Sequence, residues 1–158
     1  MKALFPILLT AGAMHPAVAL AKPASPLLGT WAVDVEHLPI PPEARPKSVT
    51  ITYSDVGEGK WRTHVEVTLP DGKAVQATSI YVPDGTPVKV EGNLEADTVA
   101  TRIPEPGVMI TALALGGVPG SMHTYTVSPD GKTMKETVVF FTHQGTPGMR
   151  TNLFKRVR

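Results

Sequence analysis

The sequence contains no cysteine, which excludes a disulfide framework, a thiolate metal site and a cysteine nucleophile. It also lacks an excess of charge of either sign, because 15 basic side chains stand against 14 acidic ones for a formal net charge of +1. This balance excludes a strongly basic nucleic-acid-binding protein and an acidic tail. Hydrophobic residues nevertheless make up 42% of the chain, so a packed core is expected rather than wholesale disorder.

Common motifs of catalysis and cofactor binding are also missing. There is no Gly-x-Ser-x-Gly elbow, and the glycine pair at 116–117 is followed by neither a lysine nor a helical pattern, which excludes a phosphate-binding loop. Ser121 and His123 share one face of a predicted strand, but no acidic partner is evident beside them. We therefore predict that the protein is not an enzyme and has no cofactor.

The histidines are scattered along the chain. Metal-ligating residues usually lie close together on one loop or helix, whereas His37, His64, His123 and His143 are far apart in the sequence. We therefore predict no metal site and interpret these histidines as solvated or core residues. A haem or catalytic site that uses His123 or His143 is a weaker alternative.

The amino-terminal segment has the features of an export signal. Residues 1–21 contain Lys2, a short apolar run at 4–14, and small residues at the end of Ala19-Leu20-Ala21. This arrangement is typical of a secretory signal peptide, here with predicted cleavage after Ala21. The apolar run is shorter than the roughly 20 residues of a membrane span; a buried helix and an uncleaved anchor are the alternatives. We therefore expect a periplasmic or secreted protein.

The remaining residues, 22–158, are expected to form one β-domain without a transmembrane segment. They carry equal numbers of basic and acidic groups. Short runs rich in Val, Ile, Thr and aromatic residues alternate with Gly, Pro and Asp, which is typical of antiparallel strands. The predicted strands are 29–35, 47–54, 60–69, 74–82, 87–91, 98–103, 107–114, 121–128, 133–143 and 149–157.

Side-chain alternation supports this interpretation. Within 60–69, Trp61 and Val65 fall on one face while Arg62 and His64 fall on the other. One buried face and one solvated face are what an antiparallel sheet closed around a core requires. The charged second face argues against a transmembrane barrel, whose outer band is apolar.

The connections predict how these strands are joined. Pro-Asp-Gly sequences at 70–72, 83–85 and 129–131 are typical hairpin turns, because Asp-Gly tolerates positive φ. Consecutive hairpins favour an all-β, antiparallel up-and-down barrel of 8–10 strands. Two segments depart from this rhythm: 37–46, whose four prolines predict a stiff extended loop that acts as a lid, and 93–97, a possible short helix.

A family resemblance rests on the first and last predicted strands. Gly29-Thr30-Trp31 at the start and Lys155-Arg156 at the end resemble the lipocalin (calycin) pattern. The resemblance implies that Trp31 plugs the barrel floor and that a basic residue stacks over its ring, with Gly29, Trp31 and Arg156 as barrel-closure residues. Whether Lys155 or Arg156 faces the indole is open, and an ordinary core tryptophan is the alternative. A cation over indole contributes about 0.5–2 kcal/mol.

Most of the mature chain is similar to lipocalin-like small exported bacterial β-barrel proteins, a group that implies no particular reaction. The motifs that carry this wider resemblance are Pro46-Lys47-Ser48-Val49, Gly92-Asn93, Asp97-Thr98-Val99 and the segment 128–134. The carboxyl-terminal helix of true lipocalins is missing, because the sequence stops directly after its last predicted strand.

The interior leads to the functional hypothesis. The stretch 107–118 is almost wholly apolar, which fits either deep burial or a cavity wall, and barrels of this size are either filled or hold one small ligand. We predict an exported, non-catalytic barrel that binds or carries a small hydrophobic molecule in the cell envelope. The alternative is a structural or protein-interaction module with a filled core. The predicted pocket residues are Met109, Leu113, Met122, Tyr125 and Phe140.

Overall fold

The computed structural model describes residues 24–92, 95–142 and 144–157. The predicted signal peptide and its cleavage site lie outside the described residues, as do His143 and the first part of the predicted helix at 93–97. The described part of that segment, 95–97, is not helical, so the helix prediction is wrong there. Within the described ranges, no helix has the length and apolar character needed to span a bilayer.

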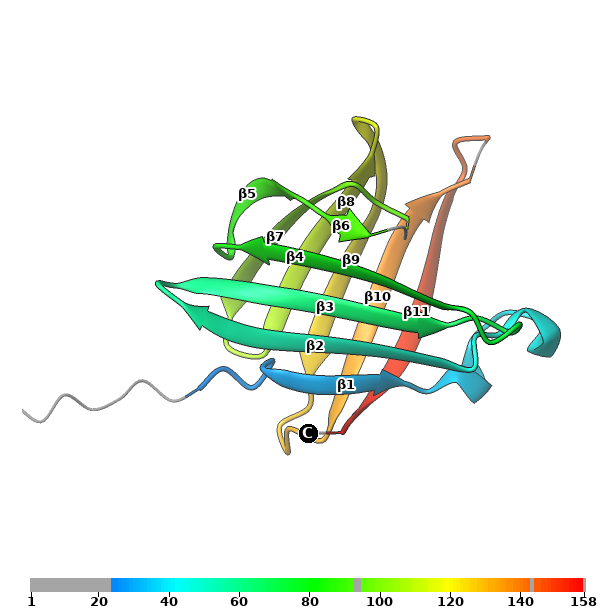
Figure 1. The fold of residues 1–158 in the computed structure, drawn as a ribbon, viewed down its shortest axis with the longest axis horizontal. Coiled ribbons are helices and arrows are strands. Elements are labelled where there is room, and N and C mark those ends of the chain that lie inside the picture. The colour runs from blue at the N-terminus through cyan, green and yellow to red at the C-terminus, as the bar shows by residue number, and fades with distance from the viewer. Residues whose placement is uncertain (1–23, 93–94, 143, 158) are drawn as a thin grey trace, which may run out of the picture.

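Eleven strands form one antiparallel sheet that curls into a nearly closed barrel (Figure 1). Every predicted strand overlaps an observed one, and the extra strand arises because 84–92 pairs in two pieces. The strands are β1 Gly29–Val33, β2 Ser48–Gly57, β3 Lys60–Thr68, β4 Ala74–Tyr81, β5 Asp84–Lys89, β6 Glu91–Gly92, β7 Thr98–Glu105, β8 Val108–Leu115, β9 Val118–Val127, β10 Thr133–Phe141 and β11 Pro147–Arg156.

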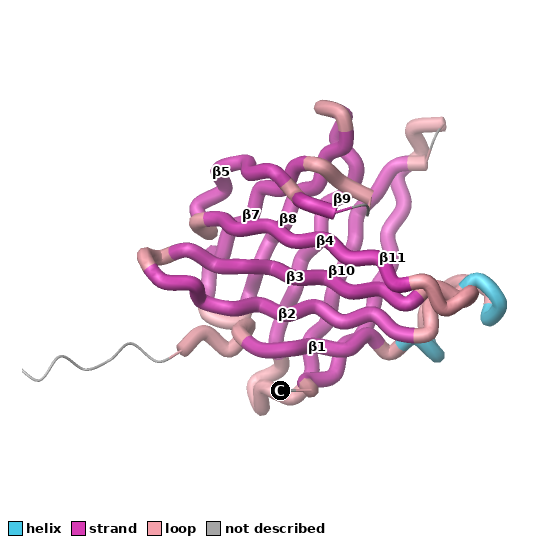
Figure 2. Tube along the Cα trace, in the orientation of Figure 1, coloured by secondary structure: helices cyan, strands magenta, loops and turns pink. Residues whose placement is uncertain are grey.

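Neighbours in the sheet are mostly neighbours in the sequence. The order β5-β7-β8-β9-β10-β11-β1-β2-β3-β4-β6 is a meander in which the first strand pairs with the last, Trp31 opposite Arg156. The two outer strands, β5 and β6, are consecutive and separated only by Val90. One extended segment therefore pairs first with β7 and then with β4, which brings the edges of the sheet together (Figure 2).

Gly92 allows the second of these pairings. Its φ is +124°, and a Cβ atom at this position would lie 2.1 Å from the Gln76 carbonyl oxygen and 2.8 Å from the Ala77 Cα. Only glycine accepts both the backbone conformation and this close approach. The short β4–β6 ladder thus depends on a residue without a side chain.

A buried floor closes one end of the barrel around Trp31. The indole is fully buried, and its Nε1 donates a hydrogen bond to the Leu27 carbonyl at 2.8 Å. The guanidinium carbon of Arg156 lies 4.0 Å from the indole ring centroid. Arg156 also donates to the carbonyls of Leu28 and Gly131, each at 2.6 Å. This side chain ties together the first strand, the last strand and the β9–β10 turn.

The strand register decides which basic residue faces the indole. Arg156 is paired with Trp31, whereas Lys155 is directed to the other face, where its Nζ lies 3.8 Å from the Asp34 carboxylate. Gly29 begins β1 with a φ of +121°, a conformation that favours glycine. Trp31 and Arg156 therefore meet at the barrel floor, and Gly29 starts the strand that carries Trp31.

The proline-rich segment between β1 and β2 differs from its prediction. It contains two one-turn 3-10 helices, Val35–His37 and Pro42–Ala44, instead of running extended throughout. Proline at the first position of the second turn has a φ suited to this conformation. The Arg45 guanidinium then fastens the loop by donating to the carbonyls of Glu36 at 2.6 Å and Ile40 at 3.0 Å.

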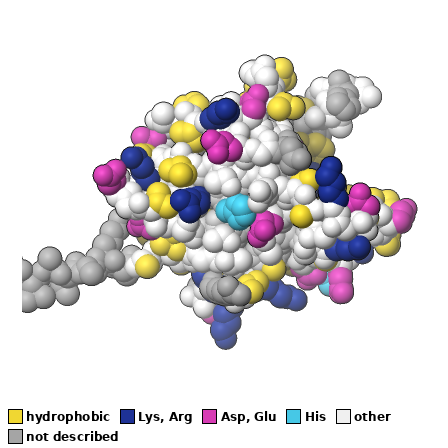
Figure 3. Space-filling view, in the orientation of Figure 1, with side chains coloured by type: hydrophobic (Ala, Val, Ile, Leu, Met, Phe, Trp, Pro, Cys, Tyr) yellow, Lys and Arg dark blue, Asp and Glu magenta, His cyan; other side chains and the backbone are white. Residues whose placement is uncertain are grey.

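The outer face of β2–β4 is solvated, as alternation predicts. Charged side chains of both signs and a histidine are interspersed over this face in the space-filling view (Figure 3). Arg62 and Glu66 project outward from β3, while Trp61 on the same strand is buried.

Candidate ligand-binding site

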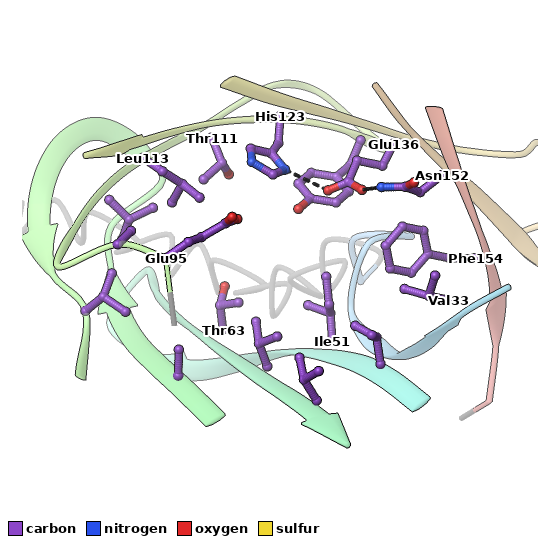
Figure 4. Close-up of a pocket in the computed structure, with 18 of the residues that line it drawn as sticks. Val33, Ile51, Thr63, Glu95, Thr111, Leu113, His123, Glu136, Asn152 and Phe154 are labelled. Carbon is purple, nitrogen blue, oxygen red and sulfur yellow. Dashed lines mark hydrogen bonds and ion pairs between the residues drawn. The ribbon is translucent and has the colours of Figure 1, made fainter. Parts of the chain in front are cut away.

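The barrel interior is not filled. A cavity of about 510 Å³ lies inside it, within the range of about 300–1,000 Å³ typical of small-molecule sites. Its walls come from nearly all strands of the barrel and from the loop between β1 and β2 (Figure 4). The cavity contradicts the alternative of a filled core.

The wall formed by β1–β4 is mainly apolar. Hydrophobic side chains that face the cavity from these strands include Val33, Val49, Ile51, Val65, Val67 and Ala77. They come from alternate positions of each strand, because successive residues of a strand point to opposite faces. This surface suits an aliphatic or aromatic chain.

The predicted lid forms part of the cavity wall. Residues 38–40 and Pro46 line the cavity, whereas Trp31 does not. Val33, two residues beyond Trp31 on the same face of β1, lines the cavity. The packed floor therefore ends between Trp31 and Val33. The cavity therefore lies between the packed floor and the proline-rich loop.

The opposite wall carries a buried polar row on three adjacent strands. His123 on β9 donates through Nδ1 to Glu136 Oε1 on β10 at 2.7 Å, and Asn152 on β11 donates through Nδ2 to Glu136 Oε2 at 2.5 Å (Figure 4). All three side chains line the cavity and are at most 9% exposed. The antiparallel register places Glu136 opposite Asn152, so the row is built by pairing between strands.

The protonation of this row follows from its contacts. Burial raises the pKa of Glu136. The hydrogen bonds from His123 and Asn152 and the electrostatic interaction with His123 together lower it by more, so the net pKa is below the usual glutamate value. Glu136 is therefore an anion at neutral pH. Because a carboxylate only accepts hydrogen bonds, His123 must carry a proton on Nδ1. Its Nε2 lies 2.8 Å from the Ser121 hydroxyl oxygen.

Two tyrosines extend the row across the interior. Tyr125 stacks on His123 with ring centroids 6.1 Å apart. It also makes a T-shaped contact with Tyr53 from β2, with ring centroids 6.2 Å apart. Burial raises the pKa of both phenols well above the usual value, and the neighbouring Glu136 carboxylate adds to the effect. Both phenols are therefore neutral over the physiological range.

Ser121, His123 and Glu136 follow the order of a hydrolytic triad, but the surroundings differ from one. Ser121 is not among the residues that line the cavity. From Ser121 onward, β9 is paired with both β8 and β10, so its backbone N–H groups bond to neighbouring strands rather than to a substrate oxygen. Acyl transfer depends on such donors to stabilise the oxyanion.

Two of the five predicted pocket residues line the cavity and three do not. Leu113 and Tyr125 face it. Met122 is 52% exposed on the outside, because Met122 and Tyr125 are separated by an odd number of positions on one strand and must point to opposite faces. Met109 is buried in the core, out of the cavity. Phe140 also does not line it, and these three assignments are wrong.

Phe140 packs against the neighbouring strand β11 and not into the cavity. A Cβ atom at position 148 would lie 2.6 Å from the Phe140 ring, so the ring rests directly on the backbone of Gly148. The Arg150 guanidinium carbon lies 5.6 Å from the centroid of the same ring. Phe140 therefore supports the rim of the barrel and not the cavity wall.

The sequence-based predictions missed Glu136 and Asn152, and treated His123 only as a core residue or a weak haem or catalytic candidate. One signal was available in the sequence. Glu136 lies two residues from both Met134 and Val138 on β10, so all three side chains point to the same face, and both neighbours are buried. A charged residue on the inward face of a barrel strand is uncommon unless it is paired. Its partners come from other strands.

No cluster of three or more His, Asp or Glu side chains able to hold a metal ion occurs among the described residues. His123 has a polar partner at each ring nitrogen, Glu136 at one and Ser121 at the other. His143 lies outside the described residues.

Comparison with known proteins identifies the fold. No family model matches the chain, and no curated protein matches it. Among solved structures, it is similar to fatty-acid-binding protein 1 of Echinococcus granulosus, with a TM-score of 0.53 and 19% identity over 84% of this chain and 98% of that chain. At this identity the similarity concerns the fold alone. The predicted all-β antiparallel barrel is confirmed, and its fold is similar to that of this fatty-acid-binding protein.

Proposed function

We propose that the protein is a non-catalytic barrel that binds or carries a small hydrophobic molecule in the cell envelope. The observation that carries this proposal is the cavity of about 510 Å³, whose walls are mainly apolar with a smaller number of polar side chains, among them Thr63, Ser79 and Glu136. This is the usual composition of a small-molecule site. The similar barrel from Echinococcus granulosus is by name a fatty-acid-binding protein, which adds support for an apolar ligand.

The location and the lack of catalysis have separate support. Export is inferred from the signal-like sequence of 1–21, and mass measurement of the protein recovered from cells would test cleavage after Ala21. The absence of catalysis is inferred from the surroundings of Ser121, which lies outside the cavity lining on a strand paired on both sides. Hydrolysis of a chromogenic ester above the buffer rate, abolished by Ser121→Ala, would contradict it.

Binding is tested with a fluorescent apolar dye such as Nile red and with native mass spectrometry of the purified protein. We expect Ala77→Phe, which places a ring in the cavity, to weaken dye binding at least about tenfold, with overpacking that costs about 1–3 kcal/mol of stability. Ala74→Phe is the matched control, because Ala74 is exposed on the same strand. Dye binding that is absent in the wild type, or equal in both variants, would contradict the proposal.

A second candidate function is protein interaction through the outer face of β9–β11. Met122, Phe141 and Met149 are 52%, 63% and 69% exposed there, and Val139 is paired with both methionines. Exposed apolar rows of this kind mark interaction surfaces. Light scattering of the purified protein across a concentration series tests it, since self-association weakened by Met149→Lys would favour this candidate.

A further inference from the structure

The outer face of β8–β11 has an order that no single strand reveals. Pairing between these four strands sets their outward side chains in rows that cross the face from strand to strand. Strand β11 runs from Pro147 at the rim of the barrel to Arg156, which is paired with Trp31 at the floor. The rows can therefore be placed in order from the rim to the floor.

Three successive rows differ in chemistry. The row nearest the rim is wholly apolar and consists of Ala112, Met122, Val139 and Met149. The next row is mainly threonine and consists of Ile110, Thr124, Thr137 and Thr151. The row nearest the floor carries the first charge and consists of Val108, Thr126, Lys135 and Leu153. The face thus changes from apolar through hydroxyl-bearing to basic.

The rim adds further exposed apolar side chains to the first row. Phe141 ends β10 and is 63% exposed, and the paired residues Leu115 and Val118 beside the β8–β9 turn are 56% and 66% exposed. The β8–β9 and β10–β11 hairpins both project from this end of the barrel (Figure 1). Single exposed apolar residues are common, but a contiguous group of this kind marks a docking surface.

The charges on this face have one sign. The structure describes every residue of β8–β11, and the one acidic residue in these strands is Glu136, which is buried and lines the cavity. The outward charged residues are Lys135 and Lys155, both exposed. The outer face of β2–β4, by contrast, carries charges of both signs (Figure 3). The face of β8–β11 therefore suits a partner that combines an apolar interior with a negatively charged surface.

The spacing of the rows fits the surface of a lipid bilayer. Successive rows are two residues apart along each strand, which corresponds to about 7 Å. Insertion of the rim as far as Val139 buries apolar side chains to about that depth, and proteins bound at a membrane interface are buried by about 5–10 Å. The threonine row then lies among the head groups, and the long side chain of Lys135 reaches the lipid phosphates.

We propose that the rim end of the β8–β11 face docks onto the surface of a membrane that contains anionic lipids. A second copy of the chain is a less favourable occupant, because two such faces bring lysine against lysine and their strands present no outward acidic side chain. The inference goes beyond the proposed function, because docking does not require a molecule in the cavity. For a carrier it brings the rim of the barrel into contact with lipid.

Flotation of the purified protein with vesicles tests the electrostatic part. We expect binding to an equal mixture of phosphatidylcholine and phosphatidylglycerol at least about tenfold tighter than binding to phosphatidylcholine alone, because each lysine near an anionic surface contributes about fivefold. Lys135→Gln is expected to lower this preference about fivefold. Lys60→Gln, at an exposed position on β3, removes the same charge from the opposite wall and leaves the preference unchanged. Lys155 is less suitable, since its Nζ also lies 3.8 Å from Asp34.

The apolar part is tested with variants at the rim. Met149→Gln is expected to weaken binding to the mixed vesicles at least about tenfold, the effect of losing one buried apolar side chain. Ile80→Gln, at a position 47% exposed on β4, is the matched control and binds like the wild type. Phe141→Trp places a tryptophan at the rim, and its emission is expected to shift to shorter wavelength with mixed vesicles. Ile80→Trp is expected to show no such shift.

The outcomes separate lipid from other occupants. Absence of binding to the mixed vesicles overturns the inference, as does equal binding of Met149→Gln and Ile80→Gln when thermal melting shows both to be folded. Self-association in light scattering that is lost in Met149→Gln, without vesicle binding, assigns the face to protein contacts and also overturns it. Because no dye or cavity ligand is used, failure here leaves the proposed carrier intact, and failure of dye binding leaves the docking surface intact.

Discussion

The two walls of the cavity are built by the same alternation of side chains and yet have opposite character. The β1–β4 wall presents aliphatic residues such as Ile51 and Val65, while the β9–β11 wall presents His123, Glu136 and Asn152. The first wall can bind any apolar chain but cannot distinguish between chains. The second adds the buried, ionised carboxylate of Glu136 and its two hydrogen-bond partners.

Outside the barrel the contrast is reversed. The outer face of β2–β4 is charged, with Arg62 and Glu66 directed to solvent, whereas the outer face of β9–β11 exposes Met122, Phe141 and Met149. The strands of the second wall therefore mix polar and apolar side chains on both faces. Inside, Glu136 lies between the buried Met134 and Val138 on β10.

The largest expected effect comes from breaking the polar wall. His123→Leu leaves the buried Glu136 carboxylate without its main partner, and we expect a loss of about 3–5 kcal/mol in the free energy of unfolding, measured in urea. His37→Leu is the matched control, because His37 makes a comparable 3.0 Å contact with Asp34 but is 76% exposed. Its loss is expected to stay below about 1 kcal/mol. Equal losses would show that the buried row has no special role.

A somewhat smaller effect is expected from the apolar wall. Ile51→Ala removes a buried side chain that lines the cavity, and we expect a loss of about 2–4 kcal/mol in stability together with weaker dye binding. Ile80→Ala, at a position 47% exposed on β4, is the control for stability. An equal loss of stability in Ile51→Ala and Ile80→Ala would contradict the role of the apolar wall.

The smallest effect concerns acid. The folded pKa of Glu136 lies below its ordinary value of 4.5, so its ionisation stabilises the protein above that pH and the contribution is lost as the pH falls through the folded pKa. Unfolding free energies of the wild type and Glu136→Gln are therefore expected to converge on acidification. Asp34 and Asp130, whose pKa values are also lowered by hydrogen bonds, contribute equally to both proteins. Parallel curves would contradict the ionised state of Glu136.

Local patterns were sufficient to predict the barrel. Pro-Asp-Gly turns and alternating strands are properties of neighbouring residues, and the stacking of a basic residue on Trp31 was implied by the lipocalin resemblance. The hairpin predicted at 83–85 is wrong, because β5 pairs with β7 and not with β4. The identity of the basic residue on Trp31 was not predictable, because Lys155 and Arg156 are adjacent and only the strand register decides which of them faces Trp31. The β4–β6 pairing through Gly92 was likewise not predictable, because it depends on the close approach of the Gln76 backbone to Gly92.

The candidate site was predicted less well for the same reason. Leu113 and Tyr125 were found from composition, but Met122 was misplaced because parity along β9 was not applied. The row of His123, Glu136 and Asn152 requires the register of three strands at once. A single sequence holds no direct record of such register, so the polar wall could be recognised only in three dimensions.

The change of pairing partner at Val90 leaves one edge of β5 without a ladder partner in the described sheet. There β5 is hydrogen-bonded to β7 but not to β4, its neighbour along the chain, while β6 is paired with β4. Amide hydrogens on this outer edge of β5 should therefore exchange with solvent sooner than those of β10, which is flanked on both sides.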